Sequence, residues 1–212
     1  MESVLDRVIK QNTENVNLLK TKDYNIFSVL QIQSKEVLIC RMIADLLNPR
    51  GQHGAGAEYL KIFLRDCLGM EKMDTKLADQ AIVTAEYAID DERRIDIVIE
   101  MGSYFLPIEV KIYAADQKSQ CFDYYQYAKR RDAQAKVYYL TLDGHRPGKD
   151  STSSGSQSVP EEDIVCLSFR EHILNWLKAC KNCGNTGMIP ILEQFIRNIE
   201  QISGYTSERV RN

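Results

Sequence analysis

The sequence lacks the features that mark membrane, secreted or strongly basic proteins. It contains no long apolar run, so we expect no membrane-spanning helix. No basic stretch followed by an apolar core opens the chain, so we expect no signal peptide and a cytoplasmic location. Lys and Arg number 27 against 30 Asp and Glu, a net charge of −3. This balance disfavours a protein that grips long nucleic acid by charge alone, but not an enzyme that contacts phosphates locally.

A complete cysteine-based zinc site is also missing. The chain has 6 cysteines, and most of them lie within apolar patterns. Cys180 and Cys183 have zinc-knuckle spacing, but no second pair and no nearby His completes four ligands. We therefore expect reduced core thiols.

The length of 212 residues suits one domain with a helical extension. Composition and apolar spacing divide the chain into an N-terminal helical extension, a core, a flexible polar loop, and a C-terminal strand with helices that pack on the core. These four parts cover 1–33, 34–142, 143–163 and 164–212.

Apolar periodicity and turn residues predict the secondary structure. Helices are predicted over about 34–47, 57–68, 117–131, 170–180 and 189–204, with Ser34 and Asp116 as N-caps of the first and third. Strands are predicted over about 81–89, 94–100, 107–112, 136–142 and 164–169.

The order of these elements predicts an α/β sandwich with a mixed central sheet flanked by helices. Three consecutive strands should form an antiparallel meander. The helix over 117–131 should then bring the fourth strand back parallel to a strand of the sheet.

The second and third strands both alternate apolar and polar residues, and Gly102 lies in the predicted hairpin between them. Ile95, Ile97 and Ile99 should share one face of the second strand, with Asp96 on the other.

On the third strand, Glu109 and Lys111 should point together off the apolar face, so the hairpin can bring them to Asp96. Two carboxylates and an ammonium at one spot suit a divalent-metal hydrolytic site, because Mg²⁺ is usually held by one or two carboxylates and waters. An ordinary hairpin with a solvated charged face is the alternative.

The order of elements, with Asp96 on the second core strand and Glu109-Val-Lys111 on the third, resembles the PD-(D/E)XK nuclease superfamily. That superfamily often carries an acid on the helix before the sheet, where Glu36 lies here. It also often carries a Gln and a Tyr on the helix after the third strand. The candidates spaced along one helical face here are Gln117, Gln120 and Tyr124.

A narrower resemblance links the chain to uncharacterised bacterial and phage members of this superfamily. It rests on the run from Glu36 through Leu-Leu-Asn-Pro to His53-Gly, followed by Glu-x-Lys-x-x-Ala-x-Asp-Gln-x-x-Gln. One departure is that Ile95 stands where a Pro often precedes the Asp of the motif.

The resemblance implies a restriction-endonuclease-like αβββαβ core and a site for Mg²⁺, with Mn²⁺ as a substitute. The implied ligands are Asp96, Glu109, the carbonyl of Val110, and Glu36. Lys111 would be the catalytic lysine, and Gln120 would support the attacking water or the scissile phosphate. Glu36 has a competitor in Glu58, which also lies near a helix start.

Further residues are candidates for contact with the substrate. Each also suits a plain structural role, as part of a helix face, a turn, or the solvated end of a helix or strand. They are Gln117, Tyr124, His53, Arg94 and Arg131.

The sequence thus favours a metal-dependent nuclease that hydrolyses phosphodiester bonds of nucleic acid, with DNA preferred over RNA. Two alternatives remain open: a catalytically weak or inactive binding module on the same fold, and a subunit that needs a partner chain to bind DNA. The terminal helices and the Tyr-rich helix could form a homodimer face.

Overall fold

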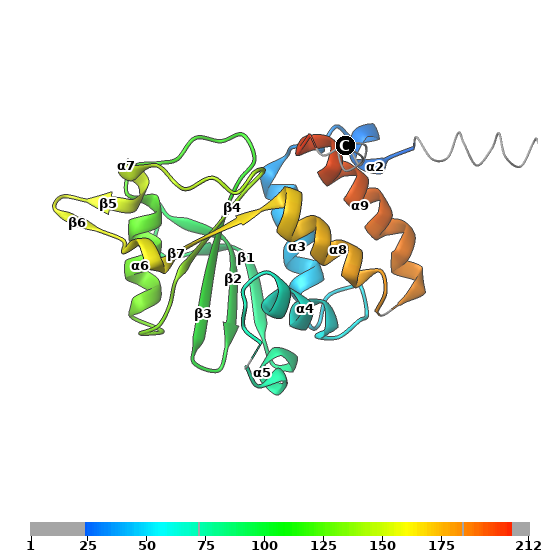
Figure 1. Cartoon of the computed structure of the whole chain (residues 1–212), viewed down its shortest axis with the longest axis horizontal. Helices are drawn as coiled ribbons and strands as arrows, with labels where there is room; N and C mark the ends of the chain where they lie inside the picture. The colour runs from blue at the N-terminus through cyan, green and yellow to red at the C-terminus, as the bar shows by residue number, and fades with distance from the viewer. Residues whose placement is uncertain (1–23, 72, 184, 205–212) are drawn as a thin grey trace, which may run out of the picture.

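The computed structural model describes residues 24–71, 73–183 and 185–204 (Figure 1). Of the expected N-terminal extension, residues 1–23 lie outside this described part. A mixed five-stranded sheet with strand order β1-β2-β3-β4-β7 forms the centre of the fold.

The strands follow the predicted topology. β1, β2 and β3 pair antiparallel as a meander, whereas β3 with β4 and β4 with β7 pair parallel. The predicted mixed sheet is confirmed. The strands are β1 (Ile82–Ala88), β2 (Arg94–Met101), β3 (Tyr104–Lys111), β4 (Val137–Thr141) and β7 (Ile164–Ser168).

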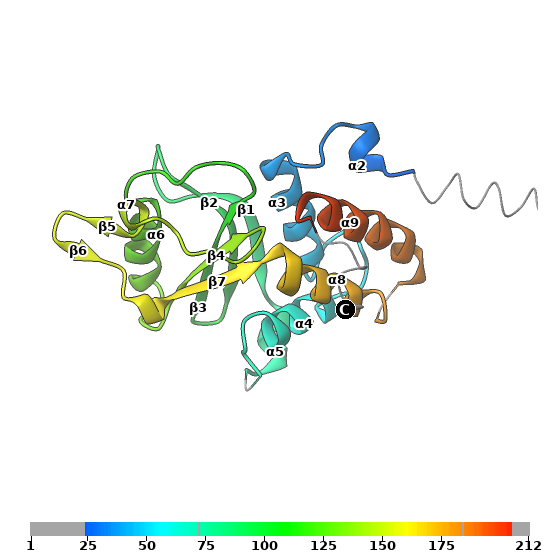
Figure 2. The same ribbon diagram turned by 45° about the horizontal axis from the view of Figure 1, so that its top comes forward.

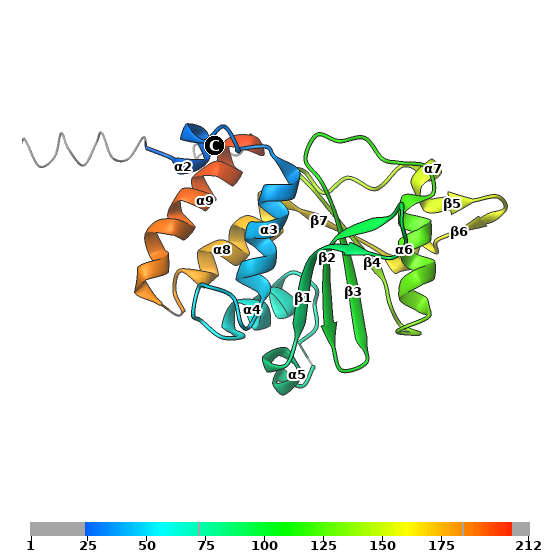
Figure 3. The same cartoon turned by 180° about the vertical axis from the view of Figure 1, so that it is seen from behind.

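One face of the sheet is covered by a helical layer that includes the C-terminal helices (Figures 1 and 3). The buried Trp176 belongs to this layer, and its indole N–H donates to the carbonyl of Tyr59 at 2.8 Å. The main helices of the layer are α3 (Glu36–Leu47), α4 (Glu58–Asp66), α8 (Leu174–Cys180) and α9 (Ile189–Ile202). Shorter elements are α2 (Ile26–Val29), α5 (Thr75–Asp79) and the 3₁₀ turn η3 (Thr186–Met188).

The opposite face packs against α6 (Gln120–Lys129), which lies across the sheet from the other long helices (Figure 2). Ile95 joins the apolar cluster beneath α6, although the sequence predicted that it shares a face with Ile97 and Ile99. The β1–β2 pairing skips Glu86, whose φ is 54°, opposite Asp96. A residue with positive φ departs from β geometry, so the strict alternation of side chains is broken at this point.

The segment between β4 and β7 is built of short elements, unlike the polar loop that the sequence predicted. They are α7 (Lys149–Thr152), the hairpin of β5 (Ser153–Ser154) and β6 (Gln157–Ser158), and η1 (Glu161–Asp163). Ser151 and Val159 are buried within it. The segment packs on α6 because it supplies hydrogen-bond partners to the start of that helix.

Helix starts differ from the predictions. Lys35, not Ser34, is the N-cap of α3. Ser119, with φ 58°, is the N-cap of α6 in place of Asp116, whose carboxylate accepts from the Tyr139 hydroxyl instead. A π-helical turn, η2 (Phe169–Ile173), precedes α8. Within the described residues, every helix is too short or too polar to cross a bilayer.

Candidate active site

A cavity of about 270 Å³ opens where β2 begins and β3 ends. It joins the first turn of α3, the two central strands, the turn after β3 and the start of α6. Its lining residues are Glu36, Glu92, Arg93, Arg94, Asp96, Glu109, Lys111, Ala114, Ala115, Gln117, Gln120 and Tyr124.

The hairpin register brings Asp96 and Glu109 together. Ile97 pairs with Ile108, so one place further along, Asp96 lies opposite Glu109 on the same face of the sheet. The Asp96 Oδ2 accepts from the backbone N–H of Val110 at 2.7 Å. This bond fixes the carboxylate across the two strands.

Lys111 lies on the face of Glu109 because strand residues two apart point the same way. Its Nζ is 2.6 Å from Glu109 Oε1, and the side chains are only 8% and 1% exposed. The second oxygen of Glu109, Oε2, is buried and has no hydrogen-bond partner among the described residues. A buried carboxylate oxygen without a partner is unusual, which marks a place where a ligand could be held.

Burial raises the pKa of Asp96, although the Val110 N–H opposes this shift. Burial also raises the pKa of Glu109 well above its usual value, and the neighbouring charge of Asp96 adds to the effect. For Lys111, burial acts to lower the pKa, but the charge and hydrogen bond of Glu109 outweigh it, so the pKa is raised. The lysine is therefore a cation and a hydrogen-bond donor at neutral pH.

The donor set fits a hard divalent cation of the Mg²⁺ type. In the described part of the chain, no group of three or more His, Cys, Asp or Glu is arranged to hold a metal. Two carboxylates nevertheless converge, and one buried oxygen of Glu109 is unpartnered. Mg²⁺ commonly takes only one or two carboxylates and fills its other positions with water and phosphate.

Glu36 reaches the same cavity from the first turn of α3. Its Oε2 accepts from the backbone N–H of Ile112 at 2.8 Å, which ties the start of α3 to the end of β3. The competitor Glu58 lies on α4 and forms an exposed ion pair with Lys61. Of the two acids, only Glu36 lines this cavity.

The glutamines and the tyrosine expected on one helical face all line the cavity, but Gln117 precedes α6. The amide of Gln120 donates to the Tyr124 hydroxyl at 3.1 Å, and that hydroxyl donates to the carbonyl of Arg94. Both side chains are buried. They link the start of α6 to the start of β2.

Arg93 also lines the cavity, next to the predicted contact Arg94. Its guanidinium donates to Gln117 Oε1 at 2.7 Å, to the Lys118 carbonyl at 2.6 Å and to Asp123 Oδ2 at 3.1 Å. It therefore clamps the turn before α6 over the cavity. The Arg93-Arg94 pair ahead of the Asp96 strand is a sequence signal for candidate phosphate contacts, and both arginines line the cavity.

Two predicted substrate contacts lie elsewhere. The ring of His53 is buried and stacks on Tyr59, and its Nδ1 accepts from the Ala55 N–H at 3.1 Å while Nε2 lies 3.0 Å from the Asn48 carbonyl. Both ring nitrogens are thus used by the backbone, which gives His53 a structural role.

Arg131 bonds Glu100 at 3.2 Å and packs over the ring of Tyr127. Glu100 is near the far end of β2, four strand residues or about 13 Å from Asp96. Arg131 therefore stabilises the other end of the sheet.

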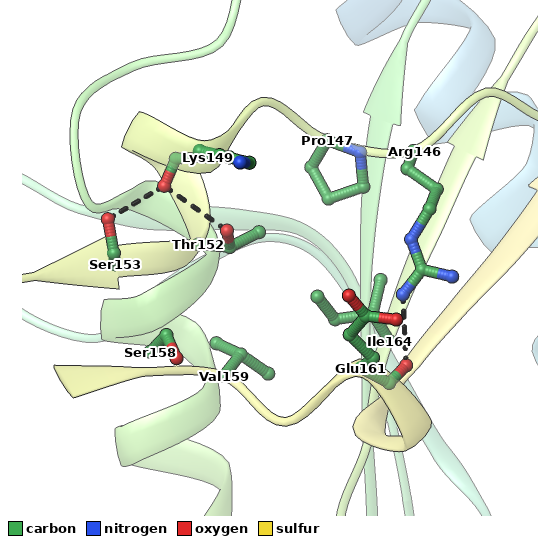
Figure 4. Close-up of a pocket in the computed structure, with 9 residues that line it drawn as sticks. All are labelled: Arg146, Pro147, Lys149, Thr152, Ser153, Ser158, Val159, Glu161 and Ile164. Carbon is green, nitrogen blue, oxygen red and sulfur yellow. Dashed lines mark hydrogen bonds between the residues drawn. The ribbon is translucent and has the colours of Figure 1, made fainter.

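A larger cavity of about 430 Å³ lies between the α7–β6 segment and β7 (Figure 4). Arg146 reaches across it to the Glu161 carbonyl at 3.0 Å, while the Ser153 hydroxyl turns back to the Lys149 carbonyl at 2.7 Å. Glu161 is the one acid in its lining, so this cavity has no carboxylate pair.

The chain also matches a known protein family. A family model of the PD-(D/E)XK nuclease superfamily matches residues 24–197. The chain belongs to this superfamily. The match runs from α2 to α9, so the predicted membership and the restriction-endonuclease-like fold are confirmed for this PD-(D/E)XK protein. Membership supports a nuclease-type function in general terms. No curated protein matches the chain in sequence.

Proposed function

We propose that this protein is a divalent-metal-dependent nuclease that hydrolyses phosphodiester bonds, with DNA as its favoured substrate. The observation that carries the proposal is the convergence of Asp96, Glu109 and Lys111 in one cavity, with a buried and unpartnered oxygen on Glu109. Superfamily membership supports the same chemistry.

Asp96 and Glu109 would hold Mg²⁺ or Mn²⁺, helped by the carbonyl of Val110 and by Glu36. When bound, the ion would supply electrostatic stabilisation of the charge that develops on the phosphate. Glu109 already holds the ammonium of Lys111 within 2.6 Å, so both groups act at the same spot.

Lys111 would orient the attacking water and stabilise negative charge by donating hydrogen bonds. Its raised pKa favours this donor role over that of a base in the metal-free state. The Gln120 amide, held against Tyr124, would support the water or the scissile phosphate. Arg94 and Gln117 would contact the phosphate backbone of the substrate at the cavity mouth.

The test is cleavage of linear, circular and single-stranded DNA and of RNA with Mg²⁺ or Mn²⁺. We expect Lys111→Ala to slow cleavage by about 10²- to 10³-fold, because an aligned charge-stabilising donor contributes that much. Lys61→Ala is the matched control, since Lys61 forms only partly exposed ion pairs on α4.

Equal cleavage by wild type and Lys111→Ala would contradict the assignment of this site. A folded wild-type protein that binds Mn²⁺ but cleaves none of the substrates would favour the partner-dependent subunit. A folded protein that neither binds Mn²⁺ nor cleaves would favour a binding module on the same fold.

A further inference from the structure

Tyr113 is an exposed aromatic side chain that adjoins, along the chain, residues that line the active-site cavity. It is 69% exposed, the largest fraction among the exposed large apolar side chains of the described residues. Ala114 and Ala115, which follow it, line the cavity. Over the described ranges, no hydrogen bond or ring contact involves the Tyr113 side chain, so the fold gives it no evident structural task.

The position of Tyr113 relative to the proposed catalytic groups is fixed by two links. It is two residues beyond Lys111, so the two Cα atoms are at most about 7 Å apart. Its neighbour Ile112 donates its N–H to Glu36 Oε2 at 2.8 Å. Val37, the residue after Glu36, is itself 44% exposed. Tyr113 and Val37, both exposed, thus directly follow the two residues that this hydrogen bond joins.

Of the three cations that line the cavity, Arg94 is the one outside an ion pair among the described residues. The ammonium of Lys111 is paired with Glu109, and the guanidinium of Arg93 is paired with Asp123. The whole chain carries a net charge of −3. One such cation on a chain of net negative charge neutralises few phosphates, so binding gains from a second source of affinity, and stacking of a base on an aromatic ring is one.

We propose that Tyr113 stacks on an unpaired base next to the scissile phosphate, so that the substrate is single-stranded or locally unpaired nucleic acid. This inference rests on the proposed nuclease function. In a duplex, each base face is covered by its neighbours, and a side chain cannot stack on it unless the base leaves the stack. A strand with unpaired bases offers a free face directly beside its backbone.

Equilibrium binding of a fluorescent single-stranded oligonucleotide, measured in EDTA so that no cleavage occurs, tests the inference. We expect Tyr113→Ala to weaken this binding roughly 5- to 150-fold, the range that base–aromatic stacking supports. Tyr113→Phe should bind like wild type because it keeps the ring. Affinity for a blunt duplex of the same sequence should change less than twofold in Tyr113→Ala.

Tyr24→Ala is the matched control, because Tyr24 is 51% exposed and directly precedes the N-cap of α2. Single-strand affinity within twofold of wild type in Tyr113→Ala, or an equal loss for the duplex, would overturn the stacking role. So would a wild-type protein that binds no single strand.

Cleavage by wild type and Lys111→Ala is measured separately. Cleavage that is lost in Lys111→Ala but unchanged in Tyr113→Ala would leave the nuclease proposal standing without the stacking. Tyr113-dependent binding without any cleavage would leave the stacking standing and remove the nuclease proposal.

Discussion

At the scale of single residues, Asp96 shows how the candidate site acts against stability. Its carboxylate is half-buried beside Glu109, and the Val110 N–H at 2.7 Å is its backbone donor. Burial raises the pKa of Asp96, which means that its ionised form is held at a cost in free energy. Residues kept for a site rather than for the fold often show this trade-off.

We therefore expect Asp96→Asn to raise the thermal unfolding midpoint of the metal-free protein at neutral pH while abolishing cleavage. An acid whose pKa is raised in the folded state destabilises the fold at pH values above its unfolded pKa of about 3.9. The increase in stability from Asp96→Asn should therefore grow above that pH and vanish below it. Calorimetry in EDTA at several pH values measures it. A lower midpoint at neutral pH would show that the Asp96 charge stabilises the fold.

At the scale of elements, the start of α6 is capped by a distant segment. Its own N-cap, Ser119, makes no side-chain cap bond. The Cys121 N–H instead donates to the hydroxyl of Ser151 at 3.3 Å, and the Ser119 N–H donates to the Asp150 carbonyl at 2.7 Å. The α7 segment thus satisfies donors that a helix start normally leaves free. It also holds in place the turn that presents Gln120 to the cavity.

Removing this cap should destabilise the protein by about 1 kcal/mol, the usual effect of losing an N-cap side chain. Ser151 is buried, so its Ala variant leaves the Cys121 N–H without its acceptor. Urea unfolding of Ser151→Ala measures the change, with the exposed Ser156→Ala as the control. Equal unfolding midpoints for Ser151→Ala and wild type would show that the cap adds nothing to stability.

At the scale of the whole molecule, one apolar core joins the helical layer to the sheet. The cluster that holds Trp176 and Phe195 also contains Ile97, Ile108 and Leu140 from the central strands. The C-terminal helices are therefore part of the same core as the strands that carry the site. The family match across residues 24–197 likewise includes both the strands and α8.

A shared core should unfold in one step. Trp176 is the single tryptophan of the chain and is fully buried, so its fluorescence reports the helical layer, while circular dichroism reports the whole chain. We expect coincident denaturant curves by the two methods. Phe195→Ala should lower the free energy of unfolding obtained from both curves by about 3–5 kcal/mol, as expected for a buried Phe. Two separate transitions would contradict a single core.

The β2–β3 hairpin shows most clearly what could be predicted from the sequence. Alternation along each strand and Gly102 in the turn were enough to predict that Asp96, Glu109 and Lys111 face one spot, because strand periodicity and hairpin register are local properties. The order of strands and helices likewise predicted the mixed sheet, since short connections and right-handed crossovers leave few topologies.

Tertiary structure alone decided the contacts between distant segments. Arg93 clamps the turn at Gln117, and Ser151 caps α6 from 30 residues away. His53 is turned into the core by its contacts with Tyr59 and the backbone. Composition could not distinguish these roles from solvated loops or substrate contacts, because each depends on which groups long-range packing brings within hydrogen-bond distance.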